Sequence, residues 1–171
     1  MKKLLLILAT FVGFAFSVNA QNYVDIWEES GSILYQTKTN NNYTIEIEYT
    51  GYTNDWRYID SFSESKVLSS NRSDYIAKAG TKTLYDIKYI KFFTQGFDYI
   101  DVWEEGGSIL YQTKGNNDYT IKIEYSSYTK DGRYVDNFSE SKVLSGNRSD
   151  YIAKAGTNTV YEIRFIKFYI R

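Results

Sequence analysis

The chain of 171 residues contains no cysteine and no histidine. Without thiols it has no disulfide framework and no attachment point for a lipoprotein anchor. Without imidazoles as well, it cannot build a Ser-His-Asp or Cys-His nucleophile, or the usual zinc site of imidazole and thiolate ligands. Any chemistry must therefore use carboxylates, hydroxyls, lysines and amides, and we expect neither metal nor cofactor.

Proline is also absent, although average usage of about 5% would place roughly eight prolines in a chain of this length. Turns must then be made by Gly, Asn, Asp and Ser. The 20 basic and 21 acidic residues are interleaved, and no basic stripe is present to neutralise phosphates. Nucleic-acid binding is therefore not expected. Aromatic residues are abundant, with 18 Tyr, 10 Phe and 3 Trp.

Residues 1–20 have the pattern of a secretory signal peptide. Lys2 and Lys3 precede an apolar run that closes on small residues, with Val18 and Ala20 in the positions typical of a cleavage site. Nothing later in the chain approaches the ~20 apolar residues of a membrane span. We expect cleavage near Ala20, export to the periplasm or the extracellular space, and no membrane span.

The chain after residue 20 consists of one sequence unit in two tandem copies. An offset of 76 residues aligns residues 23–93 with residues 99–169 without a gap, and 52 of these 71 pairs are identical. We assign a first repeat at 23–93, a short linker at 94–98 and a second repeat at 99–171. The linker contains no Pro and no Ser/Gly tract, so we expect the two units to pack on each other.

Differences between the repeats act as an internal test of burial. Exchanges of one apolar residue for another predict core positions; they occur at Val24/Ile100, Ile26/Val102, Ile59/Val135, Leu84/Val160 and Tyr89/Phe165. Trp56 is aligned with Gly132 at the equivalent position of the second repeat. Removing a buried Trp costs about 3–5 kcal/mol, so we expect Trp56 to be exposed, as a stacking platform for a sugar or an anchor for a protein.

Short strands are predicted throughout. In Tyr43–Thr50 apolar and polar residues alternate with the period of two of a half-buried strand. The other expected strands of the first repeat are 23–28, 33–37, 57–62, 66–69, 74–79 and 84–92. In the last of them the apolar phase shifts after Tyr89, which indicates a β-bulge or a crossing between layers. A helical turn stays open as the alternative for residues 73–80.

The pattern indicates an all-β protein of two tandem, near-identical small domains with mainly antiparallel strands. The successive 13-residue stretches "ILYQTKTNNNYTI" and "EIEYTGYTNDWRY", with "RYIDSFSESKVLSSNRSDY", resemble small exported bacterial domains of unknown function described as septoil-knot domains. The resemblance covers about 70 residues of each repeat. It implies strands that thread through one another and supplies no catalytic residues. Two packed β-sandwich units remain the alternative fold.

Two further functions of the polar residues, catalysis by a carboxylate pair and calcium binding, are not favoured. A glycosidase-like pair drawn from Glu28, Glu29, Asp60 and Glu64 needs only an acid and a base at a set separation. Small β units offer little depth for such a cleft, so we expect no enzymatic activity. The loop Asn40–Asn42 contains oxygen ligands suited to calcium but no carboxylate, and we interpret it as a turn.

The most conserved segment between the repeats is Phe62–Thr81, in which 19 of 20 pairs are identical. Its polar residues either meet the same partner twice or hold tight turns through bonds to the backbone. The second reading predicts that Arg72 pairs with Asp74 or Glu64; the corresponding pair in the second repeat is Arg148 with Asp150.

These observations favour an exported, non-enzymatic binding or interaction module for a glycan or a protein. Its candidate binding residues are Trp56, Arg72, Asp74, Arg148 and Asp150. A structural component of the envelope or matrix is the alternative, and a small carboxylate-dependent hydrolase is a third class.

Overall fold

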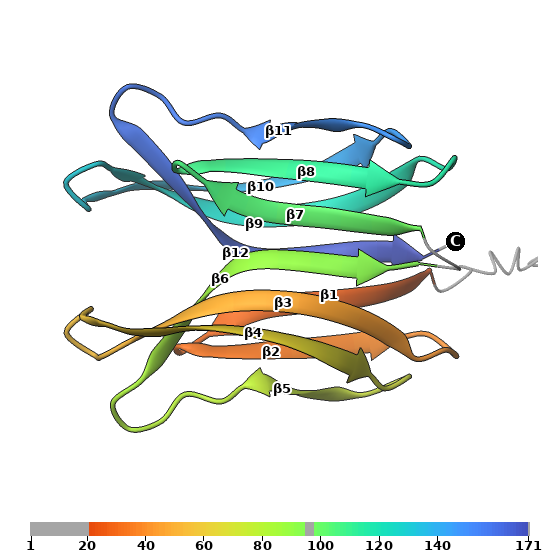
Figure 1. Ribbon diagram of the computed structural model, residues 1–171, viewed down its shortest axis with the longest axis horizontal. Coiled ribbons are helices and arrows are strands. Elements are labelled where there is room, and N and C mark those ends of the chain that lie inside the picture. Colours follow the sequence, from red (N-terminus) through yellow and green to blue (C-terminus); the bar gives the residue numbers. More distant parts are fainter. Residues whose placement is uncertain (1–20, 95–97, 171) are drawn as a thin grey trace, which may run out of the picture.

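The computed structural model describes residues 21–94 and 98–170, and within them the chain is all-β, with no helix. Twelve strands follow one another in the same order in the two repeats (Figure 1). They are β1 (Asn22–Glu29), β2 (Ser32–Lys38), β3 (Tyr43–Tyr52), β4 (Tyr58–Leu68), β5 (Ser73–Ala77), β6 (Leu84–Phe93), β7 (Tyr99–Glu105), β8 (Ser108–Lys114), β9 (Tyr119–Thr129), β10 (Tyr134–Leu144), β11 (Ser149–Ala153) and β12 (Thr159–Ile170). The predicted fold class is confirmed.

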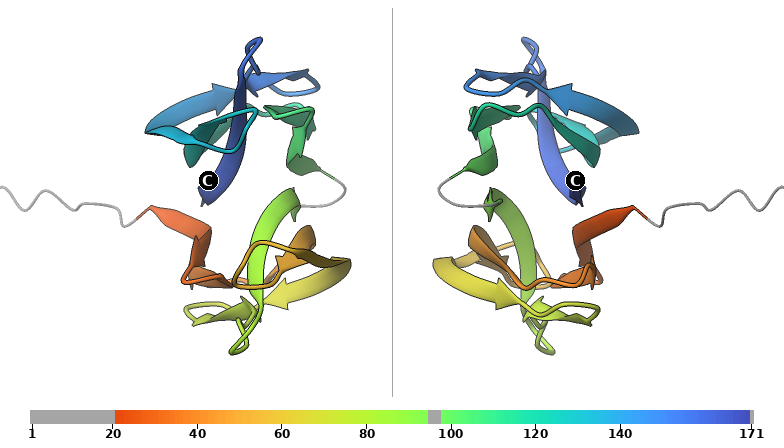
Figure 2. Two further views of the ribbon diagram at one scale, coloured as in Figure 1. Left: turned by 90° about the vertical axis from the view of Figure 1, so that its left-hand side faces the viewer. Right: turned by 90° about the vertical axis from the view of Figure 1, so that its right-hand side faces the viewer.

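Two six-stranded sheets pack face to face, and each repeat contributes half of each sheet. Sheet A has the order β10-β9-β12-β1-β2-β5, and sheet B has the order β11-β8-β7-β6-β3-β4. Every pairing is antiparallel. Each repeat is therefore a small two-layer unit, and the two units stand one above the other in Figure 2.

The units join edge to edge in both layers. β6 pairs with β7 in sheet B, and β12 pairs with β1 in sheet A. β6 and β12 enter from the outer ends of their units and run together through the middle of the molecule (Figure 1). There the rings of Phe92 and Phe168, which are equivalent residues of the two repeats, stack with centroids 4.7 Å apart. This stack lies at the centre of an approximate twofold arrangement of the repeats.

Local chemistry explains the first hairpin. The two residues between β1 and β2, Ser30 and Gly31, both have positive φ (51° and 74°), as a tight hairpin turn requires. Gly31 also accepts a hydrogen bond from the Tyr85 amide at 2.8 Å, and a Cβ at this position would lie 2.4 Å from the Leu84 side chain. The first turn thus fixes where β6 begins.

The core lies between the sheets and follows the predicted alternation. Tyr43, Ile45, Ile47 and Tyr49 of β3 point inward, and so do their counterparts on β9 except for Tyr119, which is partly exposed. The phase shift in the last strand of each repeat is a β-bulge, because Lys88 and Arg164 are the residues without a register partner on the neighbouring strands. The prediction of a bulge is confirmed.

Other expectations need correction. The two strands expected at 57–62 and 66–69 are one strand, β4 (Tyr58–Leu68), because Ser63, Glu64 and Ser65 pair with β3 despite their polarity. Ile59 and Val135 are 43% and 53% exposed, so their apolar exchange does not mark a core position. They lie on β4 and β10, which are edge strands and have no neighbouring strand on one side to cover them.

The segment 73–80 is a strand in its first part, since β5 pairs with β2, and the helical alternative is wrong. None of the described residues forms a helix of the length and apolarity that crossing a bilayer requires. The signal peptide at 1–20 and the middle of the linker lie outside the described residues. Threading of the strands stays a prediction of the resemblance.

Candidate functional site

A group of charged side chains lies near the bulges of β6 and β12, at the boundary between the two units. We call this group the seam cluster; it consists of Glu28, Asp86, Lys88, Glu104, Glu162 and Arg164. Each bulge places a cation beside the neighbouring repeat, so that Lys88 reaches Glu104 at 2.9 Å and Arg164 reaches Glu28. The cluster therefore ties the repeats together with charge-assisted bonds on both sheets.

Arg164 is the most connected member of the seam cluster. Its guanidinium also bonds to Glu162 at 2.8 Å and to the Tyr128 hydroxyl at 2.6 Å. Nη1 lies 3.9 Å from Asp86 Oδ1, an atom that has no hydrogen-bond partner among the described residues. Four carboxylates face two cations, and burial raises the pKa of Glu104 and of Glu162 above the usual range.

These raised pKa values predict a stability that falls as pH rises. The folded chain holds the protons of Glu104 and Glu162 more tightly than the unfolded chain, whose ordinary pKa is 4.5. The free energy of unfolding should therefore decrease from this pH upward until the raised pKa values are passed. Burial also raises the pKa of Asp25 and Asp101 above 3.8, which adds to the same slope.

Urea unfolding at about pH 5 and about pH 7 measures the effect, and the protein should be more stable at the lower pH. Glu104→Gln combined with Glu162→Gln should flatten the dependence. The lowered pKa values of Asp74 and Asp150 act only below 3.8, where stability is lost as pH falls. A wild-type stability that instead rises between the two pH values contradicts the assignment.

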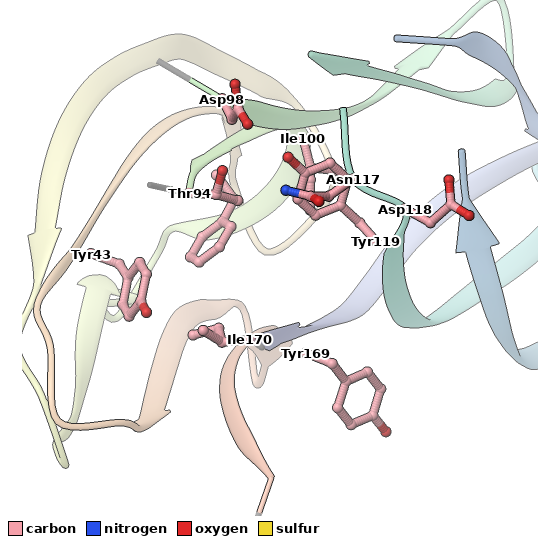
Figure 3. Close-up of a pocket in the computed structure, with 10 residues that line it drawn as sticks. Tyr43, Thr94, Asp98, Ile100, Asn117, Asp118, Tyr119, Tyr169 and Ile170 are labelled. Carbon is pink, nitrogen blue, oxygen red and sulfur yellow. The ribbon is translucent and has the colours of Figure 1, made fainter. Parts of the chain in front are cut away.

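A cavity of about 210 Å³ opens at the opposite end of the seam (Figure 3). We call it the end cavity. Both repeats line it: Tyr43 and Phe92 come from the first, and Ile100, Tyr119 and Ile170 are among those from the second. Thr94 and Asp98 come from the two ends of the linker. Three aromatic rings form much of the wall, those of Tyr43, Phe92 and Tyr119. Tyr169 also lines the cavity, but its ring points away from it in Figure 3. The polar residues of the lining are Thr94, Asp98, Asn117 and Asp118.

The turn between β8 and β9 is shaped to fit beside the end cavity. A Cβ at Gly115, where φ is 131°, would lie 2.4 Å from Asp98 Oδ2 and 2.6 Å from the Tyr119 hydroxyl. The first repeat has the buried Thr39 at the equivalent position. Asp118 Oδ1 accepts a hydrogen bond from the Gly146 amide at 3.2 Å, which fixes the turn. The second repeat has thus diverged where it lines the cavity.

Trp56 lies elsewhere, in the turn between β3 and β4, and it is 61% exposed as expected. Its φ of 62° is a conformation that favours glycine, and the equivalent Gly132 has φ 83°. The ring packs against Tyr52 with centroids 5.8 Å apart. The turn between β3 and β4 is at the opposite end of the sheets from the last residues of β6, which line the end cavity (Figure 1). Trp56 is therefore not part of the end cavity.

The four other candidate residues form two equivalent surface ion pairs. Arg72 contacts Asp74 at 2.6 Å, and Arg148 contacts Asp150 at 2.9 Å. All four side chains keep substantial exposure, so each pair adds little stability by itself. Arg72 selects Asp74 rather than Glu64, whose carboxylate accepts a hydrogen bond from the Tyr49 hydroxyl at 3.1 Å.

Other bonds in the conserved segment hold the backbone. Lys66 donates from Nζ to the carbonyl oxygens of Tyr75 and Ile76, and Lys142 makes the same contacts in the second repeat. The hydroxyl of Thr37 donates to the Ser69 carbonyl. The lysine contacts link the edge strands of the two layers, and the Thr37 contact holds the residue that follows β4 against β2. Both support the structural interpretation of Phe62–Thr81.

The carboxylates of the hydrolase alternative do not share one strand pair. Glu28 and Glu29 lie on β1 of sheet A, whereas Asp60 and Glu64 lie on β4 of sheet B. Among residues 21–94 and 98–170, no group of three or more carboxylates is placed to hold a metal ion.

The residues that line the end cavity were not singled out from the sequence. Tyr43 and Tyr119 were visible as apolar positions of alternating strands, and that pattern does not distinguish a cavity wall from a packed core. The differences Thr39/Gly115 and Asn42/Asp118 were the available signal, since they change a loop that is otherwise repeated.

No family model, curated protein or solved structure matches this chain. Its function must therefore be argued from the geometry of its own residues.

Proposed function

We propose that this protein is an exported, non-enzymatic module that binds a glycan, with one sugar ring in the end cavity. The observation that carries the proposal is the combination of aromatic rings with hydrogen-bonding side chains around one hollow. Rings such as Tyr119 supply apolar area with a polar edge, which suits the faces and hydroxyls of a sugar. Thr94, Asp98 and Asn117 supply acceptors and donors.

The size and charge of the end cavity narrow the ligand class. Its volume of about 210 Å³ is below the ~300–1,000 Å³ of sites for drug-sized ligands, so it suits one ring at the end of a chain. Asp98 and Asp118 line it, and within residues 21–94 and 98–170 no Lys or Arg does. Carboxylates accept hydrogen bonds from hydroxyls and repel anions, so a neutral glycan is favoured over an acidic one.

Two features support the non-enzymatic part of the proposal. Glu104 and Glu162, the glutamates whose pKa burial raises, lie in the seam cluster and bond to Lys88 and Arg164. Neither glutamate lines the end cavity. These two glutamates thus belong to a structural ion-pair network rather than to an acid and a base facing a substrate.

Titration with a neutral oligosaccharide, cellopentaose, tests the proposal by NMR on the purified protein. Tyr119→Ala should weaken binding at the end cavity, followed through the side-chain amide signal of Asn117, by about tenfold or more, because it removes an aromatic ring and a hydroxyl from the wall. Trp56→Gly copies the residue of the second repeat and should leave binding unchanged. An acidic pentasaccharide of galacturonic acid should bind more weakly than the neutral probe.

Two outcomes reject the glycan proposal. Loss of binding in Trp56→Gly with retention in Tyr119→Ala would move the site to the exposed turn. Absence of any response to either oligosaccharide, in a folded protein, would favour a protein partner.

Exposed edge strands support a second candidate function, that of a structural envelope or matrix component. β4 and β10 each end a sheet and carry exposed apolar side chains, including Val67 and Val143 at 59% and 60% exposure. Free edges of this kind can pair with strands of another chain. Sedimentation that depends on protein concentration would favour this candidate, whereas a monomer at all concentrations agrees with the glycan proposal.

A further inference from the structure

The outer face of sheet A carries a buried carboxylate with an unsatisfied oxygen. Asp25 on β1 is 7% exposed, and its Oδ1 has no hydrogen-bond partner among the described residues. Its other oxygen, Oδ2, lies 3.3 Å from Lys167 Nζ. An unpartnered buried acceptor is costly, and buried polar groups in folded proteins are normally bonded.

Sheet B contains the same arrangement with the acceptor satisfied. Asp101, the counterpart of Asp25, is also 7% exposed, and its Oδ1 accepts a hydrogen bond from the Tyr89 hydroxyl at 3.2 Å. The residue equivalent to Tyr89 in sheet A is Phe165. Two differences therefore separate these environments: the Tyr89 hydroxyl is missing on sheet A, and Lys122 is paired with Lys167 there, whereas Glu46 is paired with Lys91 on sheet B. Only the hydroxyl bonds to the aspartate oxygen.

A hollow lies on sheet A beside Phe165, the residue that lacks the hydroxyl of Tyr89. Asp25, Trp27, Gln36, Glu124 and Phe165 are among the residues that line a space of about 340 Å³ on the outer face of sheet A. Trp27 and Phe165 are register partners on β1 and β12, and both rings are partly exposed. Gln36 is the register partner of Asp25 on β2.

We propose that this hollow is a second binding site, distinct from the end cavity, for a hydroxyl-rich ligand of the sugar class. A ligand hydroxyl donates to Asp25 Oδ1, as the Tyr89 hydroxyl donates to Asp101 on the other sheet. The sugar ring inserts beside Trp27 and Phe165 to reach this oxygen, which is screened from solvent in the free protein.

A sugar suits the site better than a cation or an anion. Lys167 already neutralises Asp25, and Lys122 lies 2.6 Å from Glu124, so the carboxylates of the hollow are not free to hold a metal ion. Arg164 and Glu28 also line the hollow and bond to each other, so among the described residues each cation beside it is already paired with a carboxylate and none is left to attract an anion. Aromatic rings beside hydrogen-bonding groups provide the apolar contact that a single water molecule could not supply.

The two sheets allow a reciprocal experiment on the full protein. Trp27 and Trp103 occupy equivalent positions beside Asp25 and Asp101. Their indole N–H signals, assigned by Trp→Phe variants, report each face separately during titration with cellopentaose. In the wild type the Trp27 signal should shift and the Trp103 signal should not.

Exchange of one hydroxyl should reverse this selectivity. Phe165→Tyr places a hydroxyl donor of the protein beside Asp25 Oδ1, so the ligand can no longer make this hydrogen bond to a charged group. The affinity measured from the Trp27 signal should therefore fall by about tenfold or more. Tyr89→Phe removes the donor from sheet B and should make the Trp103 signal respond. Tyr119→Ala, in the end cavity, should leave the Trp27 response unchanged.

Three results would overturn the proposal. The first is a Trp27 signal that does not respond to cellopentaose. The second is a Phe165→Tyr protein that binds cellopentaose as the wild type does. The third is binding of permethylated cellopentaose, which has no hydroxyl donors, with the same affinity as unmodified cellopentaose. Thermal unfolding of both variants shows whether they are folded. Because each indole signal belongs to one face, loss of binding in the end cavity alone does not affect this test.

Discussion

Phe92→Ala should destabilise the protein by about 3–5 kcal/mol, the range for truncation of a buried aromatic residue. Phe92 is 1% exposed and stacks on two rings, Phe168 at 4.7 Å and Tyr43 at 5.2 Å. Its removal takes away contacts on both sides of the boundary between the repeats. Because the two units share both sheets, we expect one cooperative transition at lower urea concentration rather than the unfolding of one repeat alone.

Equilibrium urea unfolding, followed by circular dichroism and fluorescence, measures this effect. Phe168→Ala provides the matched variant, because Phe168 is 0% exposed at the equivalent position and should give a loss of similar size. Val67→Ala truncates an apolar side chain that is 59% exposed and should change stability by less than about 0.5 kcal/mol. A Phe92→Ala protein as stable as Val67→Ala would show that the central stack does not hold the units together.

Arg164→Ala should cost about 2–3 kcal/mol of stability. The variant leaves Glu28 and Glu162 without their cation in the seam cluster. Breaking a fully buried pair costs about 3–5 kcal/mol, and the 25% exposure of the Arg164 side chain lowers this figure through solvent screening. The same urea experiment measures it.

Two further variants test the geometry of this contact. Arg164→Lys introduces the residue that the first repeat has at Lys88, and it should recover part of the loss, since an ammonium group cannot make all the bonds of the guanidinium fork. Arg133→Ala breaks an ion pair with Asp131 in which the side chains are 82% and 60% exposed, and it should have almost no effect. Equal losses in Arg164→Ala and Arg133→Ala would exclude an energetic role for the seam cluster.

Local patterns were sufficient for much of the fold. The alternation in Tyr43–Thr50 predicts both the strand and its inward face, because side chains of a strand point alternately to its two sides. The apolar phase shift after Tyr89 indicates a bulge or a crossing between layers, and the structure has a bulge at the preceding residue, Lys88. The split of β4 into two strands was wrong because Ser63 to Ser65 are polar, and their strand conformation comes from pairing with β3 rather than from their own preference.

The candidate sites depended on contacts that no local pattern contains. Trp56 was correctly expected at the surface, because its replacement by Gly132 is incompatible with a buried ring. Tyr43 and Tyr119 are 76 residues apart, and only the stacking of the repeats places both on the wall of one cavity. The difference between Tyr89 and Phe165 reads as an ordinary apolar exchange until the neighbouring Asp101 and Asp25 are known.

Composition and repetition established that this chain is a duplicated all-β unit without cysteine or histidine chemistry, because those properties depend on which residues are present and on spacings of a few positions. The joining of β6 to β7 and of β12 to β1 was decided only in the tertiary structure. Backbone pairing between strands is nearly independent of side-chain identity, so identical repeats cannot reveal from sequence which edges meet. The seam cluster, the end cavity and the hollow at Asp25 all exist because β6 pairs with β7 and β12 pairs with β1.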